Sequence, residues 1–218
     1  MSELKAVIER RITEKVLADL TAPIPVRENS LADIDSLLAS AGNAPFHYQS
    51  SQRHREKLSS PVPWRMYKLD GANCRVLLSR LIDRSETGII RNMLAAADYV
   101  ILTTWTPDPI DGSHELASDA SFLGSLRNME HIAAGSAAVQ NLLLLATEAG
   151  WSTYWSSGGI LRSEEIFDLL DIPTTEILLG AIFLFPAERP AAETRQGKLR
   201  DARGSVDDWS KWLVVAAE

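Results

Sequence analysis

Two groups of basic residues could neutralise an anion. Arg10 and Arg11 are adjacent near the start of the sequence, and Lys198 and Arg200 lie two residues apart near its end. Arginine can hold a phosphate through two parallel hydrogen bonds. Residues two apart on an extended segment face the same side, so Lys198 and Arg200 could reach one anion. The alternatives are that Arg10 and Arg11 are solvated helix residues and that Lys198 and Arg200 belong to an ordinary basic tail. Arg195 is a rival candidate for contact with the anion.

Metal and thiol chemistry are not favoured by the sequence. The single cysteine, Cys74, excludes an intrachain disulfide, and we interpret it as a small core residue rather than a nucleophile. The histidines show no spacing typical of metal ligands; they are His47, His54, His114 and His131. We therefore predict no metal site.

The bulk composition is that of a globular protein. The 218 residues give room for one sizeable α/β domain or two small ones. The formal charge of −7 argues against a general nucleic-acid binder. The sequence has no stretch of about 18 apolar residues, so no membrane span is predicted. Met1–Leu20 is too charged for an export signal. We expect a cytoplasmic protein.

The first third of the sequence predicts helices followed by an irregular stretch. Apolar spacing predicts an amphipathic helix over Glu3–Leu20, which would carry both N-terminal arginines. Ser30 is a candidate N-cap for a second helix over Leu31–Ala41. Residues 42–63 contain three prolines and a polar run, which predicts an irregular insertion at about 46–63.

The middle and end of the sequence alternate strands with helices. The longest pattern predicts a largely buried helix from about Ala117 to Ala149, ended by Gly150. The run Glu176–Phe185 is continuously apolar, which is typical of a buried central strand. Further strands are predicted over Trp64–Leu69, Tyr99–Trp105 and Trp151–Trp155, and further helices over Asn73–Asp83, Arg91–Ala97 and from Ser163 to Leu170.

The last segment, about 187–218, is a basic arm that ends in apolar residues. Trp209, Trp212, Leu213 and Val214 have no apolar partner in their own sequence neighbourhood. The arm could pack on a second subunit or cap its own core. We favour exchange between subunits, because a large apolar helix also fits dimer formation.

The order of these elements resembles the nitroreductase-like flavoproteins. The N-terminal Arg10-Arg11-Ile12-Thr13 is similar to the family's opening Arg-Arg-Ser or Arg-His-Ser pattern. The stretch from Ala137 through Gly150-Trp151 to Trp155-Ser156-Ser157-Gly158-Gly159 carries the strongest likeness. The third likeness is the strand Leu178–Leu184, followed by the basic tail with Lys198-Leu199-Arg200.

This resemblance implies a fold, a cofactor and a reaction. The fold would be an α+β three-layer sandwich, with a mixed central sheet flanked by helices, in a single domain over 1–218. Two copies would form an intertwined homodimer with FMN at the subunit interface. The reaction would pass two electrons from NAD(P)H through the flavin to a small acceptor, such as a nitro compound or a quinone.

The resemblance also assigns roles to particular residues. Arg10, Lys198 and Arg200 would hold the FMN phosphate, and Arg11 would face the ring or form a structural ion pair. The loop Ser156-Ser157-Gly158-Gly159 would run over the flavin edge, where glycines permit close backbone approach. Trp155 could stack near the ring, or lie in the core. The alternative for the loop is an ordinary turn before a helix.

Several positions depart from the family pattern. Ile12 stands where a small polar residue is common. A basic residue of the family commonly follows nearby to meet the flavin's O2; here the candidates are Glu14 and Lys15, and Glu14 would have the wrong charge. The family's polar ring-contact segment is reduced to Ala44–Gln49, so His47, Tyr48 and Gln49 are the candidates for the substrate pocket. These departures motivate an alternative function, a non-catalytic or degenerate flavin- or ligand-binding protein of the same fold.

Overall fold

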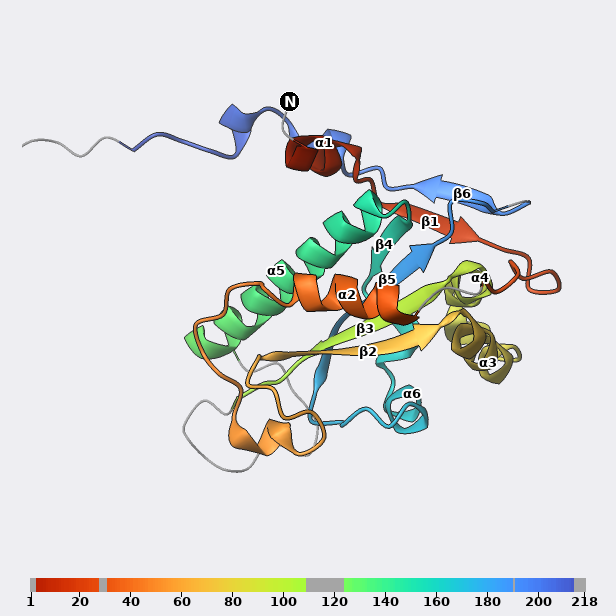
Figure 1. The fold of residues 1–218 in the computed structure, drawn as a ribbon, viewed down its shortest axis with the longest axis horizontal. Coiled ribbons are helices and arrows are strands. Elements are labelled where there is room, and N and C mark those ends of the chain that lie inside the picture. The colour runs from red at the N-terminus through yellow and green to blue at the C-terminus, as the bar shows by residue number, and fades with distance from the viewer. Residues whose placement is uncertain (1–2, 28–30, 109–123, 190, 214–218) are drawn as a thin grey trace, which may run out of the picture.

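The centre of the molecule is a four-stranded sheet with helices on both faces (Figure 1). The structure is a computed structural model and describes residues 3–27, 31–108, 124–189 and 191–213. The strands lie in the order β2 (Trp64–Asp70), β3 (Tyr99–Trp105), β5 (Ile177–Phe185) and β4 (Ser152–Ser156). The α+β class and the three layers agree with the sequence prediction.

The predicted mixed sheet needs a correction in detail. Every pair of neighbours in the four-stranded sheet is antiparallel. The parallel contact is an isolated bridge between Thr13 and Thr153. This bridge places the short strand β1 (Glu14–Leu17) beside β4. The position of β1 in turn fixes where Arg10 and Arg11, which precede it, lie.

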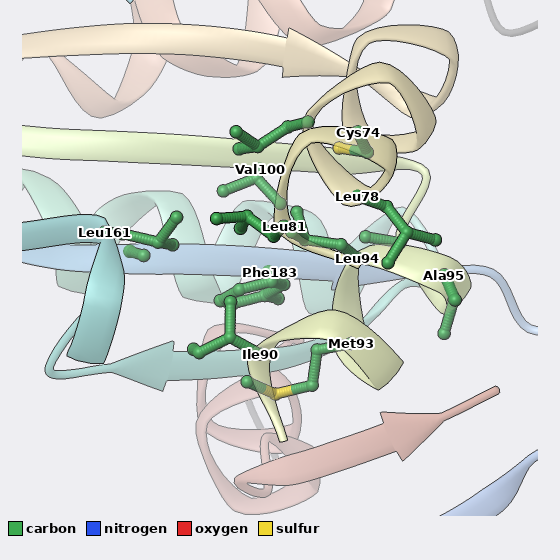
Figure 2. Packing of buried hydrophobic residues seen from close by; sticks show 14 of the residues in the cluster. Cys74, Leu78, Leu81, Ile90, Met93, Leu94, Ala95, Val100, Leu161 and Phe183 are labelled. Atoms are coloured by element: carbon green, nitrogen blue, oxygen red, sulfur yellow. The ribbon is translucent and has the colours of Figure 1, made fainter. Parts of the chain in front are cut away.

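The two faces of the sheet bury separate apolar cores. In β3 successive side chains alternate, so Tyr99 and Ile101 belong to one core and Val100 and Leu102 to the other. The helices α2 (Leu31–Ala41) and α5 (Leu126–Glu148) cover the first face; α3 (Gly71–Leu81), α4 (Ile90–Ala96) and α6 (Glu164–Leu169) cover the second. Figure 2 shows the second core, with Cys74 and Phe183 inside it. Cys74 is therefore a core residue, as predicted.

The predicted N-terminal helix is half wrong. The helix α1 (Glu3–Arg10) ends at Arg10, and the chain continues as β1 instead of reaching Leu20. β1 pairs antiparallel with β6 (Glu193–Gln196). Val16 and Leu17 are both buried, because the strand lies over the second core. The helical spacing of apolar residues beyond Arg10 is thus overridden by pairing with a distant segment.

The long helix also begins later than predicted. Residues 117–123 lie outside the described residues, and so does the candidate cap Ser30. The helix α5 starts at Leu126, where the Ser125 hydroxyl accepts a hydrogen bond from the Asn128 amide at 3.1 Å. Gly150 has φ 92° and ends the helix as predicted.

Short 3-10 helices complete the backbone. One of them, η1 (Gln52–Arg55), lies within the predicted insertion. The others are η2 (Ser85–Thr87), η3 (Gly159–Arg162), η4 (Asp201–Arg203) and η5 (Val206–Asp208). No helix among the described residues is long and apolar enough to cross a membrane. Nor do these residues contain a group of three His, Cys, Asp or Glu side chains that could hold a metal ion.

The described part of the C-terminal arm contacts its own chain at β6 and, through Gly197 and Arg200, near the end of α1. Beyond β6 the arm runs past α1 and away from the sheet (Figure 1). The Trp212 side chain is 96% exposed, and Trp209 and Leu213 are exposed as well. The arm therefore does not cap its own core over the described residues, and its exchange with a second subunit remains a prediction.

Gly180 in β5 is required by close packing. A Cβ added there would lie 2.1 Å from Trp155 Nε1 and 2.8 Å from the Ser156 carbonyl oxygen. The second contact is with backbone of the paired strand, so it cannot be relieved by a rotamer change. We expect Gly180→Ala to lower the free energy of unfolding by about 1–3 kcal/mol, measured by urea denaturation.

Gly135→Ala in α5 is the matched control. Its added Cβ would lie 3.2 Å from the end of the flexible Leu179 side chain and 3.6 Å from Trp64 Cβ, an ordinary van der Waals contact. Alanine is also the better helix former. We expect a change near zero. Equal stability losses in the two variants would contradict the packing described for Gly180.

Candidate functional site

The pairing of β1 with β6 brings the two ends of the chain together. The Gly197 amide extends the ladder by donating to the Thr13 carbonyl at 2.8 Å. Just beyond, Arg200 donates through Nη1 to the Arg11 carbonyl at 3.3 Å and through Nη2 to the Glu9 carbonyl. These carbonyls lie at the C-terminal end of α1, where a cation is favoured.

Arg11, Arg200 and Arg203 form an arginine cluster. Burial lowers the pKa of Arg11, and the positive charges of Arg200 and Arg203 lower it further. None of the ion pairs among the described side chains involves these three residues. An anion bound here would relieve their mutual repulsion, and three guanidinium groups offer the donors that a phosphate needs.

Two other predicted phosphate ligands lie near this cluster without joining it. Arg10 donates through Nη2 to the Thr147 carbonyl at 3.4 Å, in the last turn of α5. It lines a cavity of about 430 Å³ together with Glu14 and Arg189. Lys198 lies two residues beyond the end of β6 and is exposed. The structure thus brings Arg11, rather than Arg10, next to Arg200.

Glu14, the acidic residue that departs from the family pattern, is neutralised by another residue of the same chain. Glu14 is only 6% exposed and accepts a hydrogen bond from the Ser152 hydroxyl at 2.6 Å. Arg189 Nη1 lies 2.6 Å from the same carboxylate oxygen. A buried carboxylate with a cation beside it avoids the cost of an unpaired charge. Glu14 and Arg189 together therefore add no net charge at this point of the site.

The predicted glycine loop follows β4. Gly158 and Gly159 have φ of 108° and 53°, a region that side-chain-bearing residues rarely adopt. The Gly158 amide donates to the Ser156 hydroxyl at 3.2 Å, and Arg162 donates to the Ser157 carbonyl. Ser157 and Gly159 are exposed, so this edge of the loop is open to a ligand.

Trp155 faces the core that contains α5. It packs against that core and is half-buried, with its indole directly over Gly180. This contact shows a packing role for Trp155, which is one of the two interpretations that its sequence left open. A stacking role toward a planar ring remains a prediction.

The arginine cluster and the glycine loop are separated along one strand edge. The parallel bridge of Thr13 with Thr153 places Arg11 level with about residue 151. From there to Ser156 is five residues, or about 16 Å at the rise of a strand. Positive charge and the exposed edge of the glycine loop are thus spaced for the two ends of one elongated anionic ligand.

The predicted substrate-pocket residues lie elsewhere in the chain. Arg127 at the start of α5 is 5.3 Å from the ring centroid of Tyr48 and donates to the Gln49 carbonyl at 3.0 Å. His47 is exposed beside them. Arg127 and Thr147 are twenty residues apart on α5, which is about 30 Å of helix. Within one chain, His47, Tyr48 and Gln49 do not meet the arginine cluster.

Sequence reasoning missed three arginines in and around these sites. Arg203 and Arg189 were part of the predicted basic arm, but only the fold shows which of its side chains turn toward Arg11 and Glu14. Arg195, the rival in the arm, forms an ion pair with Glu193. Arg127 has no sequence signal that would place it against Tyr48.

Known structures match this chain over most of its length, although no family model matches its sequence. A nitroreductase-like family protein from Bacillus cereus superposes with a TM-score of 0.59 at 18% identity, over 95% of this chain and 97% of that one. A nitroreductase with bound FMN from Bacteroides fragilis gives 0.55 at 14% identity, over 94% and 99%.

The chain has the nitroreductase-like fold. A protein from Bacteroides thetaiotaomicron, described as a candidate NADH dehydrogenase/NAD(P)H nitroreductase, also matches, with a TM-score of 0.55 at 17% identity over 97% of this chain and 98% of that one. The predicted resemblance is thereby confirmed at the level of the fold. A nitroreductase-like fold can carry different activities, so the function has to be argued from the residues of the site.

Proposed function

We propose that the protein is an FMN-dependent oxidoreductase that passes two electrons from NAD(P)H to a small acceptor, such as a nitro compound or a quinone. The observation that carries this proposal is the arginine cluster with the glycine loop about 16 Å along the strand edge. A phosphate at the cluster and a flavin ring at the loop would match the two ends of FMN. The solved neighbour from Bacteroides fragilis contains bound FMN.

Different residues of the chain would hold the phosphate and the ring of the cofactor. Arg11, Arg200 and Arg203 would neutralise the phosphate, with Lys198 and Arg10 nearby. The backbone amides of the exposed Ser157 and Gly159 would donate to the ring edge, where negative charge accumulates on reduction. FMN itself supplies the two-electron chemistry, so the chain needs no nucleophile or metal.

A complete site in this proposal requires a second copy of the chain. The end of α5 that contacts Tyr48 and Gln49 lies about 30 Å from the end that Arg10 contacts. If the segment with His47, Tyr48 and Gln49 borders the acceptor beside the flavin, it must come from the partner. The exposed Trp209, Trp212 and Leu213 of the arm are the surface that we expect a partner to cover.

A non-catalytic flavin- or ligand-binding protein is the alternative. The pairing of Glu14 with Arg189 favours it, because a neutral pair stands where the resemblance expects a cation near the flavin. A cation there would stabilise the negative charge of the reduced ring. Without it, the flavin would be bound but harder to reduce.

The test of the proposed function is reduction of the bound flavin. We expect the purified protein to take up FMN, and anaerobic NADH or NADPH to bleach its visible absorbance. A nitroaromatic or a quinone should then restore the colour. Bound FMN that neither nicotinamide reduces would support the non-catalytic alternative, and no FMN binding would overturn the proposal.

Arg11→Ala tests the phosphate assignment. Losing a charge-assisted hydrogen bond should weaken FMN binding by roughly 1.5–3 kcal/mol, measured by fluorescence titration. Arg195→Ala removes the same charge from an exposed residue paired with Glu193 and serves as the control, with little change expected. Arg10→Ala, measured in the same way, tests the assignment of Arg10 to the phosphate that the family resemblance implies. Unchanged affinity in Arg11→Ala would remove Arg11 from the site.

A further inference from the structure

A second polar cavity lies away from the proposed flavin site. It has a volume of about 400 Å³ and lies between the insertion, at Arg53–Leu58, and the segment Pro173–Glu176 that leads into β5. Tyr67 of β2 completes it. This size falls in the range of small-molecule sites, roughly 300–1,000 Å³. None of its lining residues belongs to the arginine cluster or to the glycine loop.

The insertion wall of this cavity is held firmly in place. Arg65 is buried, and its Nη2 donates to the His54 carbonyl at 2.7 Å and to the Leu58 carbonyl at 3.3 Å. His54 Nε2 lies 3.0 Å from the Pro107 carbonyl oxygen, and Lys57 pairs with Asp171. These contacts tie the insertion to the rest of the fold, so the cavity is built rather than left by a loose loop.

The base of the cavity carries a buried carboxyl group. Glu176 is 5% exposed and accepts hydrogen bonds from the Tyr67 hydroxyl, at 2.9 Å to Oε1 and 3.0 Å to Oε2. The Thr104 hydroxyl also donates to Oε2. A carboxylate can accept about four hydrogen bonds, so Oε1 can take a further donor from the cavity. Burial raises the pKa of Glu176, and a bound cation would offset that cost.

The insertion wall carries charges of both signs. Arg53, Glu56 and Lys57 of the insertion line the cavity together with Glu176. Lys57 is already paired with Asp171, so we consider Arg53 as the cation of this wall for a ligand. His54 lies between Arg53 and Lys57 in the sequence, and burial lowers its pKa, which favours the neutral ring. Leu58 and Pro173 add apolar surface. The cavity therefore offers a buried acceptor at Glu176, a guanidinium group at Arg53 and room for an apolar group.

We propose that this cavity binds a small zwitterion of the amino-acid type, with its ammonium group on Glu176 and its carboxylate on the Arg53 side. A purely anionic ligand would place its charge near Glu176, and a purely cationic one would meet Arg53. A ligand that carries both charges satisfies both walls. The proposed amino-acid site does not involve FMN, so its test is independent of the proposed redox function.

Isothermal titration calorimetry with the standard L-amino acids tests this proposal on the full-length protein, with and without FMN. The tightest binder is then compared with its decarboxylated amine and its deaminated acid. We expect the amino acid to bind at least about tenfold more tightly than either analogue, because each lacks one charge-assisted contact. No binding by any amino acid, or equally tight binding by the acid alone, would overturn the proposal.

Variants of the two walls locate the ligand. Glu176→Gln keeps the shape of the side chain and should weaken amino-acid and amine binding about tenfold while leaving acid binding unchanged. Arg53→Met should weaken amino-acid and acid binding and spare the amine, which keeps the test valid if Glu176→Gln fails to fold. Asp83→Asn removes an exposed carboxylate that does not line the cavity; it is the control and should bind normally. Unchanged affinity in both wall variants would contradict the assignment.

Discussion

The antiparallel pairing of β1 with β6 is the constraint on which the candidate cofactor site depends. It joins residues about 180 positions apart in sequence, and a contact of such long range forms only within the complete fold. The pairing places Arg200 on the carbonyls at the end of α1 and gathers three guanidinium groups beside β4. The repulsion within that cluster is the cost of holding a site ready for an anion, and packing of Val16 and Leu17 on the core helps to offset it.

The long helix α5 sets the scale of the whole site. Its C-terminal end contacts Arg10 and its N-terminal end contacts Tyr48 and Gln49. One chain therefore presents the two parts of the proposed site at opposite ends of one helix. A symmetric dimer turns such an arrangement into two complete sites, because each copy supplies the half that the other lacks. The exposed apolar end of the arm and the open edge of the glycine loop are consistent with that assembly.

Local patterns predicted most of the core, and distant pairings account for what they missed. The strand Glu176–Phe185 and the helix Leu31–Ala41 were predictable, because apolar runs and 3.6-residue periods are local signals. β1 was taken for helix, because the partner that makes it a strand lies at the far end of the chain. For the same reason the roles of Arg203 and Arg189 were not predictable, whereas the meeting of the N-terminal arginines with Arg200 followed from the family resemblance.

Sedimentation velocity of the FMN-loaded protein, recorded at both the protein and the flavin absorbance, tests most directly whether two copies hold the cofactor together. We predict that the flavin signal moves in a single boundary with protein of twice the mass of one chain, and that dilution to monomers releases the flavin. Flavin that stays bound to a species of one-chain mass, or a dimer that leaves all of the flavin behind, would contradict the shared site.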